Sequence, residues 1–347
     1  MDSLTQIALG SAVTVAVMGR RTAVWKSALW GAVAGTLPDL DAFIDHGDAV
    51  LNMVLHRAES HALVLLTLFS PLLAWLVTRL HGEGALWRRW WLALWLALVT
   101  HPLLDTMTVY GTQLLQPFSD HPFGVGSLFI IDPAYTLPLL AGVIAVLCGA
   151  RLRWNHAGLA LSTLYIGWSV LAQQHATEVA RADLQAKGVD VQQLLVTPAP
   201  FNTVLWRLVA MTPTHYLEGH YGLLDDDRSI TWTVHDRGVD LETAVAGHAG
   251  AQRIRAFSHG FYALSREGSG YAITDLRMGQ EPTYIFRFDL GDGSGSVPTA
   301  RTGERNDVES GLKWLSARVR GIEVPSPGAR TPGVKRLGAA ELSGPVR

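Results

Sequence analysis

Apolar residues are concentrated in roughly the first half of this 347-residue chain, whereas charge, glycine and turn residues dominate the second half. This uneven division implies two different solvents, because lipid-embedded and water-exposed segments need opposite surfaces. The average composition, 48% hydrophobic and 17% charged, hides the division. We therefore expect a membrane-embedded first half and a soluble second half.

Six apolar segments can be drawn at about residues 4–18, 23–37, 61–78, 90–104, 134–149 and 157–173. A spanning helix needs about 20 apolar residues, so the first two segments could instead form a tilted or re-entrant hairpin that turns at residues 19–21. Tryptophans near the segment ends favour a membrane, since amphipathic rings settle at the headgroup level. We expect a membrane α-helical bundle of about six apolar helices.

The second half changes to a polar helix that ends near Lys187 and then to short runs separated by turn residues. These runs predict the strands of an antiparallel sheet. The predicted domains are a transmembrane helical domain with a metal site over 1–174, a soluble α+β domain over 175–322, and a disordered tail over 323–347.

Charge and cysteine content exclude several classes of function. The net charge of −2, with no stripe of Lys or Arg, argues against nucleic-acid binding. Cys148 is the only cysteine, so neither an intramolecular disulfide nor a multi-thiolate metal site can form. Any metal must be held by nitrogen and oxygen ligands.

Lys and Arg in the connections predict an orientation, because cytoplasmic loops retain positive charge. The connections after the first, third and fifth segments carry Arg20, Arg21, Lys26, Arg79, Arg88, Arg89, Arg151 and Arg153. Those after the second and fourth carry only Arg57. The chain is therefore expected in the bacterial inner membrane as a multi-pass protein, with its site and C-terminal domain facing the periplasm.

The first candidate motif is Asp39 and Asp41, which follow Pro38 at the end of the second segment. Pro38 ends or kinks the preceding helix, and two carboxylates at alternate positions can bind one metal or bridge two. The alternative is an acidic N-cap of the next helix.

The second motif holds His56 and His61 just before the third apolar segment. Neutral imidazoles are the commonest metal ligands, although two interfacial histidines are the alternative. Arg57, the lone cation of this loop, could pair with a carboxylate or hold an anionic phosphate or carboxylate of a substrate.

The third motif is His101 and Asp105, four residues apart near the end of the fourth segment. Residues at i and i+4 share one helix face, and an ionisable pair inside an apolar segment usually marks function. The alternative is a His–Asp hydrogen bond that holds two helices together.

The three motifs together predict one or two divalent cations with zinc as first choice and Mn or Fe as alternatives. The candidate ligands are Asp39, Asp41, His56, His61, His101 and Asp105. Such a metal lowers the pKa of bound water and polarises an ester or phosphoester. Glu59 is the candidate general base or a further ligand. Asp120, His121 and Asp132 are candidate partners that orient the ligating imidazoles.

At these same motifs the sequence resembles the YdjM-like family of inner-membrane metal-dependent hydrolases. The resemblance runs in order through Met1–Gln6, Leu37–Asp41, His56–Arg57 with Ser60–His61, His101–Asp105, Tyr110–Leu115 and Pro117–Asp120. It is clear over about residues 1 to 135. It implies a membrane-bound hydrolase with a metal held by those Asp and His residues. Ala62 is a departure, because the family has a hydroxyl residue after the second histidine.

The sequence therefore predicts a membrane-bound, metal-dependent hydrolase that acts on a lipid-linked or amphiphilic ester or phosphoester at the periplasmic membrane face. The expected partners are the lipid bilayer and a lipid-like or amphiphilic substrate, with a protein partner for the C-terminal domain. The alternative is a non-enzymatic ion-binding transporter, or a membrane scaffold that binds a partner protein.

Overall fold

The computed structural model describes residues 1–295, 299–302, 308–326 and 335–337. The chain forms two compact units, which are described separately. Unit 1 comprises Met1–Ile44, Leu55–Ser169 and Pro200–Asn202. Unit 2 comprises Asp45–Val54, Val170–Ala199 and Thr203–Arg347. Unit 2 thus includes a short segment from the first sixth of the chain.

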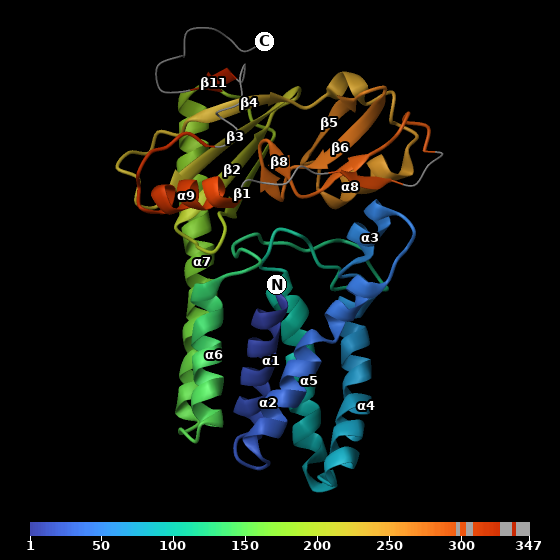
Figure 1. Cartoon of the computed structure of the whole chain (residues 1–347), viewed down its shortest axis with the longest axis vertical. Coiled ribbons are helices and arrows are strands. Elements are labelled where there is room, and N and C mark those ends of the chain that lie inside the picture. The colour runs from blue at the N-terminus through green and yellow to red at the C-terminus, as the bar shows by residue number, and fades with distance from the viewer. Residues whose placement is uncertain (296–298, 303–307, 327–334, 338–347) are drawn as a thin grey trace. The chain divides into compact units, whose positions relative to one another are not determined.

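Unit 1 is built from helices. They are α1 (Ser3–Met18), α2 (Val24–Thr36), η1 (Pro38–Phe43), η2 (Glu59–His61), α4 (Leu63–His81), η3 (Gly84–Leu86), α5 (Trp87–Asp105), α6 (Pro133–Leu147) and the first part of α7 (Arg153–Ala186). Helix α1 packs on α2, α5 and α6, and α4 packs on α5 (Figure 1). Helix α1 is therefore central among the unit 1 helices.

Local chemistry sets where these helices begin. The Asp2 carboxylate accepts hydrogen bonds from the backbone nitrogens of Leu4 and Thr5 and so caps α1. Asp132 caps α6 in the same way, with Pro133 at the first helical position. Helix α2 gives way to η1 at Pro38, whose ring cannot continue an α-helical hydrogen-bond ladder.

Helices α1 and α2 approach closely at three glycines. A Cβ atom added at Gly31 would lie 2.0 Å from Thr14 Oγ1 and 2.3 Å from the Gly10 carbonyl oxygen, and one at Gly35 would lie 2.5 Å from the Gln6 carbonyl oxygen. Thr14 donates to the Ser27 carbonyl across this contact, at 2.7 Å. Small residues let two helix backbones pack this closely.

The predicted bundle of about six apolar helices is wrong. Within the described residues, only α4 is long and apolar enough to cross a membrane. Helices α1 and α6 are apolar but have 16 and 15 residues, and α2 has 13, which is short of the roughly 17 to 25 that a span requires. The predicted multi-pass arrangement assumed several spanning helices, and the described residues supply one candidate.

Unit 2 contains two antiparallel sheets. The larger one has the order β1 (Gln193–Pro198), β2 (Leu205–Met211), β3 (His215–Gly222), β4 (Trp232–Asp236) and β11 (Lys335–Leu337). The smaller one has the order β10 (Ala300–Thr302), β9 (Arg287–Asp289), β6 (Gly270–Asp275) and β5 (Tyr262–Glu267). Beside them lie α3 (Ala49–Leu55), η4 (Val239–Leu241), α8 (Ala249–Phe257), α9 (Val308–Val319) and the hairpin of β7 (Gly279–Gln280) and β8 (Thr283–Tyr284). Most of the predicted tail over 323–347 lies outside the described residues.

The second part of α7 packs on the larger sheet. Its apolar stripe, which includes Val179 and Leu184, shares one core with Trp206 and Trp232. A buried ion pair between Arg207 and Glu218 lies in the same unit, and Arg207 also donates to the Leu276 carbonyl and the Tyr284 hydroxyl. These bonds pair the buried charges and link the strands to the hairpin of β7 and β8, and removing one partner would leave an uncompensated buried charge.

His220 on β3 should make unit 2 sensitive to acid. Burial lowers the pKa of this imidazole to about 4, whereas an unfolded chain binds the proton below about 6.5. The neutral imidazole of His220 therefore contributes to the free energy of unfolding above about pH 6.5. This contribution, as much as about 3 kcal/mol, is lost as the pH falls toward 4. Thermal unfolding of the full chain in detergent should show a flatter pH dependence for His220→Gln. The exposed His46→Gln control should unfold with the wild-type pH dependence.

Candidate metal centre

Four side chains from three segments of unit 1 converge on one point. Asp39, His61, His101 and Asp105 each offer one ligand atom, and these atoms all lie within 4.8 Å of one another. Asp39 comes from η1, His61 from η2, and the other two from the last turn of α5. His101 and Asp105 reach the same point because they lie one helical turn apart.

Five of the six separations among the four ligand atoms suit a tetrahedral ion. The Nε2 atoms of His61 and His101 are 3.1 Å apart. Each of them lies 3.4 or 3.5 Å from Asp39 Oδ1 and from Asp105 Oδ2. A tetrahedron with ligands about 2.0 to 2.1 Å from its centre, as for zinc, has edges of about 3.3 to 3.4 Å. The residues therefore fit a zinc-sized cation.

The hydrogen bonds of both imidazoles aim their Nε2 atoms inward. The Nδ1 atom of His101 lies 2.6 Å from the Gly35 carbonyl oxygen, which can only accept, so Nδ1 carries the proton. The Ser60 hydroxyl donates to Asp41 at 2.5 Å and therefore accepts from His61 Nδ1 at 2.8 Å. Fixing the tautomer through the outer nitrogen in this way is typical of metal-ligating histidines.

The four side chains are almost entirely removed from solvent. The side chains of His61, His101 and Asp105 are fully buried, and that of Asp39 is 21% exposed. Asp105 Oδ2 is among the buried described atoms that accept no hydrogen bond, although Arg57 Nε lies 3.3 Å away and balances part of its charge. An inward-facing carboxylate oxygen beside two inward imidazole nitrogens is the donor set that a divalent cation would satisfy.

Asp41 and His56 do not join the group of four. His56 Nδ1 lies 2.8 Å from Asp41 Oδ1, and Asp41 Oδ2 also accepts from the Arg57 backbone nitrogen at 2.9 Å. With its bond from Ser60, Asp41 thus organises the segment that carries His61. Their assignment as direct ligands stays a prediction, and in this structure they contact each other beside the group of four.

Arg57 lies buried against the group. Its Nε is 3.3 Å from Asp105 Oδ2, its Nη1 donates to Thr108 Oγ1 at 3.2 Å, and its guanidinium lies 5.0 Å from the centre of the Tyr110 ring. Its φ of 67° is a strained value for a residue with a side chain, of the kind that clusters at functional sites. The structure thus pairs this cation with a carboxylate.

The other predicted residues are not members of the group of four. Glu59 begins η2 and is exposed, and Asp120 and His121 are exposed in the following loop. Asp132 is buried, where it caps α6 and accepts from the Tyr165 hydroxyl at 3.1 Å. The imidazoles are oriented by Gly35 and Ser60 instead of these three residues.

Sequence reasoning missed several groups beside the site. They are the Gly35 carbonyl, the Ser60 hydroxyl and Gln6, whose Nε2 donates to Asp105 Oδ1 at 3.0 Å. The amino nitrogen of Met1 also contacts Asp105 Oδ1. Ser60 and Gln6 belong to motifs that carry the family resemblance, which was a usable signal. No sequence signal marks a backbone carbonyl.

The carboxylates around His61 make metal binding sensitive to pH. Burial alone would lower the pKa of His61, but Asp105, Asp39 and Asp41 outweigh it and raise the pKa to about 9. Below that pH an incoming cation must displace a proton, so its affinity falls as the pH falls. For one proton, zinc should bind about 30-fold more tightly at pH 8.0 than at pH 6.5. Competition with a calibrated chelator at both pH values checks this, and equal affinities would contradict it.

A family model described as the YdjM inner membrane protein matches residues 1–176, which is half of the chain. The chain belongs to the YdjM inner membrane protein family. All the residues of the metal group lie within the matched region. Membership identifies the protein as an inner-membrane protein and does not by itself assign a reaction.

This YdjM family member is also similar to a protein from Bacillus subtilis (strain 168). The uncharacterized protein YfhP is 24% identical over 232 residues, which cover 63% of this chain and 68% of that protein. The aligned length exceeds the region matched by the family model. No solved structure matches the chain.

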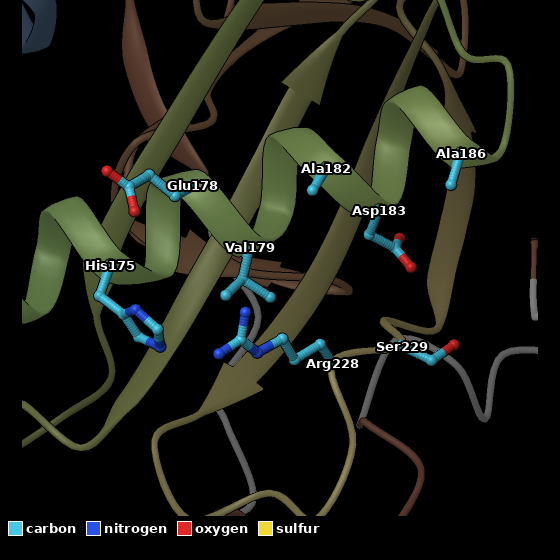
Figure 2. Close-up of a pocket in the computed structure, with 8 residues that line it drawn as sticks. All are labelled: His175, Glu178, Val179, Ala182, Asp183, Ala186, Arg228 and Ser229. Carbon is cyan, nitrogen blue, oxygen red and sulfur yellow. The ribbon is translucent and has the colours of Figure 1, made fainter.

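A hollow in unit 2 has different chemistry. It lies along α7 and has a volume of about 490 Å³ (Figure 2). Its lining residues are His175, Glu178, Val179, Ala182, Asp183, Ala186, Arg228 and Ser229. The Asp183 carboxylate is already engaged by Lys187, the Ile230 backbone nitrogen and Trp232 Nε1. This acid supports the fold of unit 2, so the hollow is the weaker candidate for a site.

Proposed function

We propose that this family member holds a divalent cation, zinc first, with Asp39, His61, His101 and Asp105 as its ligands. The observation that carries the proposal is the 3.1 Å separation of two Nε2 atoms, each of whose Nδ1 atoms is held as a donor by a separate acceptor. Two lone pairs at this distance repel each other unless a cation or a proton lies between them.

We further propose that the cation supports hydrolysis of a lipid-linked or amphiphilic ester or phosphoester. A divalent cation supplies Lewis-acid polarisation and lowers the pKa of water. Asp39 is the one partly exposed ligand of the four, so water and substrate would approach from its side. Arg57 would balance negative charge beside Asp105, and the exposed carboxylate of Glu59 is the candidate general base.

The periplasmic face is the proposed location of the site. Helix α4 begins two residues after His61 and ends near Arg79, and α5 begins with Arg88 and Arg89 close behind. Positive charge is retained on the cytoplasmic side, which favours the His61 end of α4 as periplasmic. With Cys148 replaced by serine, a cysteine at the exposed Asp120, in the loop tied to the His61 end of α4, should therefore react in intact cells with a membrane-impermeant maleimide. Reaction only after the cells are lysed would reverse the orientation.

A non-enzymatic role has one specific observation in its favour. Four protein ligands complete a tetrahedral shell, and three of them are fully buried; closed shells of this kind are typical of structural metals. In this alternative, an ion-binding transporter or scaffold, the cation stabilises the helices while unit 2 recruits a protein partner.

Cobalt substitution separates the two functions. A catalytic site should accept a fifth ligand, so the visible spectrum of the Co²⁺-loaded chain should change when phosphate is added. Hydrolysis of phosphoester and carboxylic ester amphiphiles in mixed micelles should then depend on His61, with His156→Ala, an exposed histidine of the same unit, as control. An unchanged spectrum and no hydrolysis would reject the hydrolase and support a structural role for the metal.

A further inference from the structure

The two most exposed large apolar side chains among the described residues lie in segments that connect to the metal group. Phe43 is 86% exposed and Phe118 is 81% exposed. They lie in different segments, η1 and the loop between α5 and α6. Single exposed apolar residues are common and need no explanation. Two highly exposed aromatic rings in neighbouring segments suggest that something apolar covers them.

Both segments are tied to the residues that lead into α4. The Leu63 backbone nitrogen, at the start of α4, donates to the Leu114 carbonyl at 3.0 Å. Gln113 donates from its backbone nitrogen to the Arg57 carbonyl at 2.9 Å. On the other side, Asp41 of η1 accepts from the Arg57 backbone and from Ser60. Phe118 and Phe43 are therefore anchored close to the same helix end.

Helix α4 indicates how deep that end lies. It has 19 residues and is about 28 Å long, close to the hydrocarbon thickness of about 30 Å. Apart from Thr67 and, in the last turn, Arg79, its exposed side chains are apolar, for example Leu68 at 69% and Leu80 at 61%. If the helix crosses an inner membrane, Leu63 lies at the boundary between acyl chains and headgroups.

Further exposed apolar residues accompany the two rings. Leu40 and Phe43 are three residues apart in the 3₁₀ helix η1 and so lie on one face. Leu40, Ile44 and Leu115 are 54%, 55% and 46% exposed. Amphipathic and aromatic side chains at this depth are stabilised by the interfacial layer of a bilayer.

We propose that Phe43 and Phe118 insert into the headgroup–acyl boundary of the membrane that α4 crosses, so that lipid borders the rim of the metal group. An amphiphile could then reach Asp39 laterally from the bilayer. The inference rests on family membership and on α4, and it is independent of hydrolysis.

Site-directed spin labelling in lipid nanodiscs tests the proposal. Cys148, the only cysteine, is replaced by serine, and nitroxides are attached at Phe43→Cys and, separately, at Phe118→Cys. Leu68→Cys on α4 marks the hydrocarbon, and Asp120→Cys, which is exposed in the same loop as Phe118, marks water. Power saturation then compares collisions with oxygen and with a water-soluble nickel chelate.

The labels at Phe43 and Phe118 should collide often with oxygen and rarely with the nickel chelate, at a shallower depth than the label at Leu68. Collision with the nickel chelate as frequent as at Asp120 would place the rings in water and overturn the proposal. Poor access to both reagents would overturn it too, because protein would then cover the rings. A thermal unfolding temperature equal to that of the Cys148→Ser parent shows that each labelled chain is folded, and the two positions are independent trials.

Discussion

Replacing His61 or His101 by alanine should remove nearly all of the zinc from the purified protein. Each imidazole supplies one of four ligand atoms, and each is fully buried, so solvent cannot easily substitute for it. Loss of a partner that merely orients a ligand already costs about 10- to 100-fold in affinity. Loss of the ligand itself should cost more than that range.

The measurement is metal content by mass spectrometry after dialysis against a zinc buffer of fixed free concentration. His156→Ala is the matched control, because His156 is exposed in the same unit and should leave the content unchanged. Ser60→Ala should retain the site but weaken it by about 10- to 100-fold, since His61 loses its acceptor. A wild-type chain without stoichiometric Zn, Mn or Fe, and with the same content in both histidine variants, would refute the metal site.

Substituting Gly31 by alanine should destabilise unit 1 and weaken the metal site together. The added methyl group would lie 2.0 Å from Thr14 Oγ1 and 2.3 Å from a backbone carbonyl, so α1 and α2 must separate. Overpacking of this kind costs about 1 to 3 kcal/mol or more. The separation also moves Gly35 and Gln6, which contact His101 and Asp105 respectively.

Thermal unfolding and zinc affinity of the Gly31→Ala chain in detergent give the two readouts. Gly167→Ala is the control, because nothing lies within 4 Å of a Cβ atom at that position of α7. A Gly31→Ala chain with lower thermal stability but wild-type zinc affinity would show that the helix pair does not hold the site in place.

Hydropathy located the apolar segments but did not predict the lengths of the helices that they form. Hydropathy measures the preference of a segment for lipid or water, whereas the ends of a helix depend on capping residues, glycine and proline. Helix α7 shows this most clearly, because it continues for 34 residues across the boundary between apolar and polar sequence. Helices α1 and α2 are short because Asp2, Gly19 and Pro38 bound them.

The candidate site shows a similar limit. The spacing of His101 and Asp105 predicted that they share a helix face, since that relation is local. Asp39 and Asp41 look equivalent in sequence, as do His56 and His61. The structure separates the members of each pair, because Ser60 and the backbone nitrogen of Arg57 hold Asp41 beside the group of four. Which member faces inward depends on these tertiary contacts, and no local pattern records them.

The segment Asp45–Val54 has a consequence for how the protein is made. It joins Asp39 to His61 along the chain, yet it packs with unit 2, where Asp48 accepts hydrogen bonds from Thr299, 251 residues later. A ribosome that has released both histidine motifs must still synthesise most of the polypeptide before this segment meets its partner. Completion of the ligand-bearing loop is thus a late event in biosynthesis, and a nascent chain would carry an unfinished loop into the membrane.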